Sequence, residues 1–225
     1  MKRTCTRSVV SAAVLVVSGC ASGSSDEAAT AEFLVFPEKI YVGADDAGHT
    51  YTAPVITQNA PGAVTWKLDD ESVASLTPDG SNARLVGKKA GATMLHITAG
   101  NATLDASVTV YGYTGAQYAA GEKRYTTGFD DMNPACKDCH APGKGPDHTS
   151  TELDADTDEE IQHTFVTGKD PEGRPVNYEH EYDTLLKNYS HEWHVTEQEK
   201  IGLVAYLRAL PDMGYPAYDE PTTEK

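Results

Sequence analysis

The clearest prediction for the fold of the first half of this chain comes from the stretch Ala92-Thr93-Met94-Leu95-His96-Ile97-Thr98-Ala99. Because successive side chains of a β-strand point to opposite faces, its odd-numbered residues would share one face and its even-numbered residues the other. The odd-numbered face contains Leu95 and Ile97, so the stretch predicts a strand with one apolar face. His96 lies on the other face, where we expect an outward-facing or hydrogen-bonded histidine without a ligand role.

Short runs of the same kind recur throughout residues 32–111. They are rich in Val, Ile, Thr and Leu, and clusters of Gly, Pro, Asp and Asn separate them. A spacing of roughly ten residues between such runs is typical of an antiparallel β-sandwich. The other runs are Phe33–Phe36, Ile40–Val42, Tyr51–Thr57, Ala63–Leu68, Ala83–Val86 and Ala106–Tyr111. Residues 32–111 are therefore predicted to form an all-β domain.

Several segments of this region resemble the bacterial immunoglobulin-like domain, group 2 (BIG2). The resemblance is carried by Ala63–Trp66, Ser72–Leu76, Gly80, Lys89–Thr93 and Val108–Val110. It implies an immunoglobulin-like (Ig-like) sandwich over residues 32–111, with Trp66 in the core. Since a fold does not specify a function, such a domain would serve either as a spacer or as a docking module.

The five residues Cys136-Lys137-Asp138-Cys139-His140 have the Cys-x-x-Cys-His spacing through which a haem becomes covalently attached. Two thiols one helical turn apart can each add to a haem vinyl group, and the adjoining imidazole reaches the iron. The motif predicts one haem c, attached at Cys136 and Cys139, with His140 as the proximal iron ligand. Zinc-binding or redox thiols are the alternative, which the trailing histidine and an export signal disfavour.

The N-terminus has the features of such a signal. Three basic residues precede the apolar stretch Val9–Val17, which is too short to span a membrane. The following Val17–Cys20 resembles the lipobox of bacterial lipoproteins, which implies that residues 1–19 are a signal peptide and that Cys20 is lipidated. Ala21 favours the outer membrane or cell surface over inner-membrane retention, with the membrane contacted through the lipid anchor.

Two further segments connect the predicted domains. Residues 20–31 are small and polar, so they cannot bury a core and are expected to be a flexible tether. Residues 112–115 contain two glycines and are expected to form a hinge before the helical part of the chain.

From residue 116 onward the pattern becomes helical. Residues 116–127 predict a first helix, and the capping boxes at Thr157–Glu160 and Thr196–Glu199 begin two more. The second of these helices would end at Gly168 and the third before Pro211. Three helices around the Cys-x-x-Cys-His motif predict an all-α region.

Residues 116–212 resemble a class I c-type cytochrome, through Gly121–Tyr125 and the last predicted helix. The resemblance implies that Gly121 meets an aromatic residue, here Tyr206, where the first and last helices cross. The expected fold class is therefore two-domain, with an N-terminal all-β Ig-like sandwich and a C-terminal all-α cytochrome c-like domain. An acidic tail, residues 213–225, would follow.

The resemblance does not extend to the distal iron ligand, because no Met lies between Cys139 and Thr196. In related cytochromes the distal Met precedes the cap of the last helix by about six residues, so His191 is the preferred ligand. His194 and His180 are the alternatives. Trp193 is a candidate for the wall of the haem crevice. Two histidine ligands would give a lower reduction potential than His/Met ligation.

One more histidine, His148, follows the haem motif within Gly-Pro-Asp-His. It is expected either in an exposed loop or in contact with a haem propionate. The exposed loop is favoured.

Composition limits the partners. The chain has 18 basic and 34 acidic residues, a formal net charge of −16, so nucleic acid is excluded as a partner. The charge suits a redox partner with a basic docking face, and equally a solvated surface that the charge keeps soluble. With no catalytic constellation beyond the haem, the sequence predicts a lipid-anchored monohaem cytochrome and not an enzyme. It would transfer single electrons between cell-envelope redox partners. The alternative is a haem enzyme or small-ligand sensor with an open or displaceable distal site.

Overall fold

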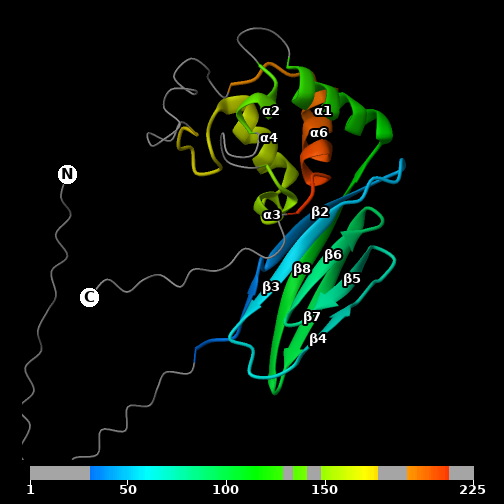
Figure 1. The fold of residues 1–225 in the computed structure, drawn as a ribbon, viewed down its shortest axis with the longest axis vertical. Coiled ribbons are helices and arrows are strands. Elements are labelled where there is room, and N and C mark those ends of the chain that lie inside the picture. Colours follow the sequence, from blue (N-terminus) through cyan, green and yellow to red (C-terminus); the bar gives the residue numbers. More distant parts are fainter. Residues whose placement is uncertain (1–30, 129–133, 141–147, 177–191, 213–225) are drawn as a thin grey trace, which may run out of the picture. The chain divides into compact units, whose positions relative to one another are not determined.

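The computed structural model describes residues 31–128, 134–140, 148–176 and 192–212 (Figure 1). The predicted signal peptide, Cys20, His180, His191 and the tail 213–225 lie outside the described residues. The described part of the chain from residue 32 onward forms one compact unit.

The first half of this unit contains eight strands in two four-stranded sheets. One sheet has the order β1 (Leu34–Phe36), β3 (Thr52–Gln58), β6 (Asn82–Gly87), β5 (Ala74–Asp79). The other has the order β2 (Lys39–Asp45), β8 (Ala102–Tyr113), β7 (Gly91–Ala99), β4 (Val64–Leu68). All neighbours are antiparallel except β2 and β8, which run parallel. Two packed sheets with these strand orders form an Ig-like sandwich, and that prediction is confirmed.

Strand β7 shows why these residues form the sandwich. Leu95, Ile97 and Ala99 are fully buried between the sheets, as their alternation predicts. Trp66 on β4 is half-buried and packs against this core. On the outer face the His96 ring nitrogens lie 2.6 Å from Asp105 and 3.0 Å from Asp69. Hydrogen bonds to these two carboxylates raise the pKa of His96.

The second half of the unit contributes short helices: α1 (Gly115–Thr127), α2 (Cys136–Cys139), α3 (Ser150–Leu153), α4 (Asp158–Thr167) and α6 (Glu197–Arg208). Both predicted capping boxes are present, at Thr157 for α4 and at Thr196 for α6. Gly168 ends α4 in the left-handed conformation, with φ at 65°. Among the described helices, none is long and apolar enough to cross a membrane.

The expected fold class was wrong in its second half. Among the described residues, strands account for 37% and helices for 28%. The helices do not form a separate all-α cytochrome c-like domain. They belong to the same compact unit as the sandwich. The physical reason is that buried polar groups of the helices find their hydrogen-bond partners on the sandwich.

Arg208 of α6 is the centre of this joint between helices and sandwich. Its guanidinium is 2% exposed and donates to Asp158 at 2.8 Å and to the Tyr41 carbonyl on β2 at 3.0 Å. The hydroxyl of Tyr113 on β8 donates to the same Asp158 carboxylate at 2.8 Å. The buried ion pair between Arg208 of α6 and Asp158 of α4 is thus hydrogen-bonded to both β2 and β8.

A second contact joins the end of α6 to the other sheet. Arg84 of β6 donates two hydrogen bonds to the Asp212 carboxylate, at 2.7 and 2.9 Å. Thr52 of β3 donates to the same carboxylate at 3.0 Å. One sheet therefore contacts α6 itself, and the other contacts Asp212 in the segment that follows α6.

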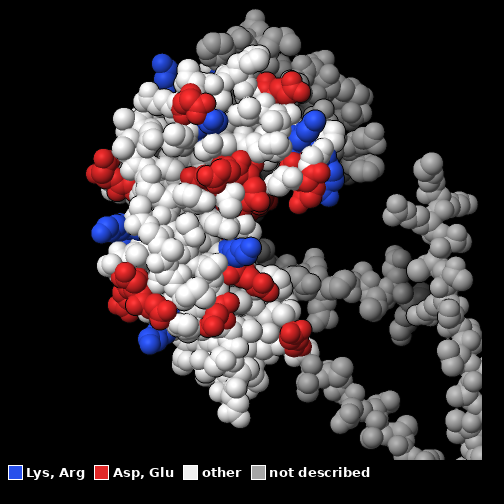
Figure 2. Space-filling view, turned by 180° about the vertical axis from the view of Figure 1, so that it is seen from behind, with Lys and Arg blue, Asp and Glu red and all other residues white. Residues whose placement is uncertain are grey.

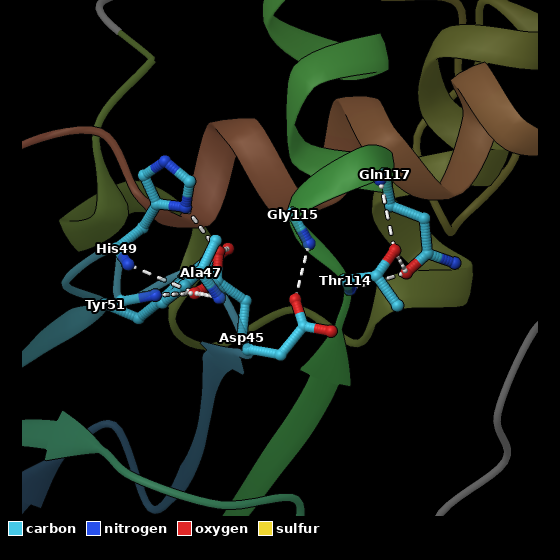
Figure 3. A network of polar contacts seen from close by, with 9 residues as sticks. Asp45, Ala47, His49, Tyr51, Thr114, Gly115 and Gln117 are labelled. Carbon is cyan, nitrogen blue, oxygen red and sulfur yellow. Dashed lines mark hydrogen bonds and ion pairs between the residues drawn. The ribbon is translucent and has the colours of Figure 1, made fainter.

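Residues 112–115, expected to be a hinge, continue the secondary structure without a loop. Strand β8 runs to Tyr113, and the Thr114 side chain accepts the Gln117 N–H at 3.2 Å to cap α1 (Figure 3). The Gly115 N–H donates to Asp46 at 2.8 Å. Because Tyr113, Thr114 and Gly115 are each hydrogen-bonded, this segment has little freedom to bend.

The loop after β2 approaches α1 through the Asp45 network shown in Figure 3. Asp45 accepts backbone N–H bonds from Ala47 and His49 and the hydroxyl of Tyr51, and contacts the His49 ring. Burial alone would raise the pKa of Asp45, but these bonds outweigh it and lower the pKa. The His49 ring in turn stacks on Tyr118 of α1, with 3.5 Å between ring centres.

Asp154, at the end of α3, lies in the same joint and is buried. Its carbonyl accepts the Tyr41 N–H of β2 at 2.7 Å. Burial raises the pKa of its carboxyl to about 8; Arg208 opposes this shift and Asp156 adds to it. Between about pH 4 and pH 8 the folded protein therefore keeps a proton on the Asp154 carboxyl that the unfolded chain has lost.

We expect Asp154→Asn to stabilise the protein increasingly as the pH rises. The unfolded carboxyl ionises near its ordinary pKa of 3.8 and the folded one near 8, so wild-type stability falls across this window, whereas an amide does not titrate. The melting temperatures should agree near pH 4, and the variant should melt about 5 °C higher near pH 8. Thermal unfolding followed by circular dichroism measures this. Equal melting temperatures at pH 8 would contradict a neutral buried carboxyl.

Candidate cofactor site

The Cys-x-x-Cys-His motif forms the single helical turn α2. The Asp138 N–H donates to the Ala135 carbonyl and the His140 N–H to the Cys136 carbonyl, both at 2.9 Å. His140 is the residue that ends this turn. Neither Cys136 nor Cys139 is part of a disulfide. The turn therefore presents two thiols and an imidazole within one short helical segment.

The Cys136 thiol is buried against the helices. Burial raises its pKa to about 11, and the nearby Arg124 charge only partly offsets this. In the folded chain this thiol is therefore protonated near neutral pH.

Cys136 and His140 line a cavity of ≈ 850 Å³, solvent at its mouth included. Most of its lining is apolar, as is usual for cofactor pockets, and comes from α3, α4, α6 and the segment after α4. The apolar side chains are Leu153, Ile161, Phe165, Val176, Leu203 and Leu207. Two of the three motif side chains, Cys136 and His140, therefore face a largely apolar space, whereas the half-buried Cys139 is not among the residues that line it.

The crossing of α1 and α6 shapes one wall of this cavity. Gly121 of α1 meets Gly202 of α6 so closely that a Cβ atom on Gly121 would lie 1.8 Å from the Gly202 carbonyl oxygen. The implied contact of Gly121 with Tyr206 is not the one observed. Tyr206 instead packs against the rings of Tyr118 and Tyr125, with ring centres 5.4 and 5.0 Å away.

His148 lies beside His140, the predicted proximal ligand. Its ring stacks on His140, with 3.6 Å between centres and 20° between planes, and packs against Tyr125 at 5.9 Å. It lines the cavity and is half-buried, so the favoured expectation of an exposed loop was wrong. Its position shortly after the motif was the only signal in the sequence.

The distal candidates are placed differently from one another. Trp193 lines the cavity. Its backbone N–H donates to the Phe165 carbonyl at 2.9 Å, and the centre of its indole ring lies 5.6 Å from the Arg124 guanidinium. His194 is exposed and lines a separate groove on the outer side. His191 and His180 lie outside the described residues. Within the part of the chain that the structure describes, no group of three or more His, Cys, Asp or Glu could hold a metal ion.

Fold and site together define an Ig-like sandwich joined to short helices that enclose an apolar cavity with a Cys-x-x-Cys-His turn in its wall. No protein-family model and no curated protein matches the chain.

Similar solved structures share only part of the chain. Domains 4 and 5 of the S-layer protein SbsC are 18% identical over 36% of this chain, with a TM-score of 0.29. The chain spans about half, 51%, of that SbsC fragment. The M1 domain from titin is 8% identical over 36% of this chain and 95% of its own length, with a TM-score of 0.29.

Proposed function

We propose that this chain is a monohaem c-type electron carrier of the cell envelope. Cys136 and Cys139 would each form a thioether with a haem vinyl group, and His140 would bind the iron. When bound, the haem supplies a one-electron redox couple. The observation that carries the proposal is that Cys136 and His140 of the Cys-x-x-Cys-His turn line a cavity whose other walls are mostly apolar.

The residues around the turn fit this cofactor. Apolar side chains from α3, α4 and α6 would exclude water from the ring faces, which lowers the local dielectric and influences the redox potential. His148 packs flat against His140 and restricts the orientation of its ring. His191 stays the preferred distal ligand, with His180 next, because His194 turns to the outer groove.

The N-terminal sequence supports an extracytoplasmic location. Cleavage before Cys20 and its lipidation would anchor the protein at the outer membrane or cell surface. Covalent haem attachment and export would then occur in the same compartment. A chain with a net charge of −16 suits redox partners with a basic face and not nucleic acid.

We expect the full-length protein, made in bacteria that attach c-type haem, to retain one haem after denaturation and extraction with acidic acetone. Intact mass and the absorbance of the extracted protein measure this. Joint replacement Cys136→Ser and Cys139→Ser should abolish the retained haem and leave membrane attachment unchanged. The matched control Cys20→Ser should keep the haem and release the protein from the membrane.

Two results would decide against the proposal. Wild-type protein without retained pigment or added mass would refute haem attachment. Retained haem in the double variant would show that the attachment site lies elsewhere.

A further inference from the structure

A second hollow, the outer groove, lies on the other side of Trp193 from the cavity. It is lined by Val166 of α4, by residues 192–195 and by Glu197 and Lys200 of α6. Trp193 lines both the cavity and the outer groove. Trp193 is therefore a shared wall of the candidate cofactor site and the outer groove.

Trp193 is held by contacts to two helices. Its backbone N–H donates a hydrogen bond to the Phe165 carbonyl of α4, and its indole ring lies against the guanidinium of Arg124 of α1. Arg124 also donates to the His194 carbonyl at 3.5 Å. Residues 193 and 194 are thus held to both α1 and α4, and the partition between cavity and groove is part of the packed structure.

The outer groove has an apolar centre. Val166 is 38% exposed, and among the described residues only Phe36 is another large hydrophobic side chain of comparable exposure. Trp193 and Val195 beside it are half-buried. An exposed apolar patch with polar residues around it is the usual composition of a protein-binding surface.

The rim of the groove has a small net negative charge. Of its two carboxylates, Glu192 and Glu197, the second lies 2.7 Å from the Lys200 ammonium, which offsets its charge, so the net charge of the rim comes from Glu192. In residues 116–212 acidic residues outnumber basic ones, and two of the basic residues, Arg124 and Arg208, are buried. Acidic side chains also predominate on the face shown in Figure 2. The complementary surface has an apolar centre and a basic rim.

We propose that the outer groove is the docking surface for a redox protein with a basic face, and that electrons cross at Trp193. This inference rests on the proposed haem. When bound, the haem would supply the one electron that the oxidised cofactor of the partner gains, with no bond broken and no proton moved.

The test uses reduced, haem-loaded full-length protein mixed in a stopped-flow instrument with an oxidised basic mitochondrial cytochrome c as the probe partner. Val166→Lys introduces a positive charge in the apolar centre, and Thr103→Lys makes the same charge change on exposed Thr103 of β8. At low ionic strength Val166→Lys should lower the second-order rate constant about tenfold, whereas Thr103→Lys should lower it less than about twofold. The difference should shrink in high salt. Oxidation by an uncharged small oxidant, benzoquinone, should be equal in both variants.

The outcomes separate this inference from the proposed function. Protein without covalent haem would refute the function itself. Haem-loaded Val166→Lys that reacts as fast as Thr103→Lys would overturn the docking surface alone. A wild-type dimer that Val166→Lys converts to a monomer would assign the groove to a second copy of the chain and would also overturn it.

Discussion

Replacing Arg208 with Met is expected to lower the free energy of unfolding by about 3–5 kcal/mol, the usual cost of removing one partner from a buried ion pair. The change leaves the Asp158 carboxylate buried without its cation. It also removes the donors to the carbonyl oxygens of Tyr41, Leu153 and Asp156, at 3.0, 2.9 and 2.6 Å. Burial already raises the pKa of Asp158 against the effect of Arg208, so the carboxyl should take up a proton more readily in the variant.

Urea unfolding of the full-length protein, followed by circular dichroism, measures this loss. The matched control is Arg174→Met, since Arg174 is 69% exposed and pairs with Asp170 and Glu172 at the surface. An exposed pair contributes about 1 kcal/mol or less, so this control should unfold almost as wild type does. Equal losses in the two variants would refute the joint as a main source of stability.

The position of Arg208 also predicts how the protein unfolds. Because Asp158 is bound by both Arg208 and Tyr113, helices and sandwich share the same buried contact. The wild-type protein should therefore lose both in a single transition.

Gly121→Ala is expected to destabilise the protein by roughly 3 kcal/mol, at the upper end of overpacking effects, because the new methyl group meets backbone that cannot move alone. Its Cβ would lie 1.8 Å from the Gly202 oxygen and 2.1 Å from the carbonyl carbon. The two helices must separate, which displaces Tyr125 and Leu203 from the cavity wall. Lower thermal stability and a reduced yield of haem-loaded protein are the expected measurements.

Gly62→Ala is the matched control for this helix crossing. The nearest atom to its Cβ would be the Gly100 nitrogen at 3.4 Å, a tight but tolerable contact. The control should change stability by less than about 1 kcal/mol. A Gly121→Ala protein as stable as this control, with full haem content, would mean that the close helix crossing is unimportant.

Local features of this protein could be predicted from its residues alone. The faces of the strand around Leu95 and Ile97 follow from alternation, and the starts of α4 and α6 follow from Thr157 and Thr196 with their glutamates three residues later. The thiols and imidazole of α2 are adjacent for the same reason. In each case the relevant interaction joins residues less than about two helical turns apart.

The prediction of a separate all-α domain was wrong because it rested on a family resemblance, which gives no information about contacts between distant residues. Residues 116–212 have the helix signals of an independent domain, yet Arg208 and Asp158 are 50 residues apart and Asp158 and Tyr113 are 45 apart. No local pattern shows that these three side chains share one buried site. For the same reason the sequence did not show that Gly202 is the partner of Gly121, or that His148 lies flat on His140.

Alternation, capping and the spacing of thiols and imidazole act within a few residues, so the sandwich, the helix starts and the Cys-x-x-Cys-His turn could be predicted from local sequence. That helices and sandwich form one unit, and that Trp193 lines both a cavity and a surface groove, depends on contacts between residues far apart in the chain. Burying a charged or polar group requires partners in space. In this protein those partners come from distant strands and helices.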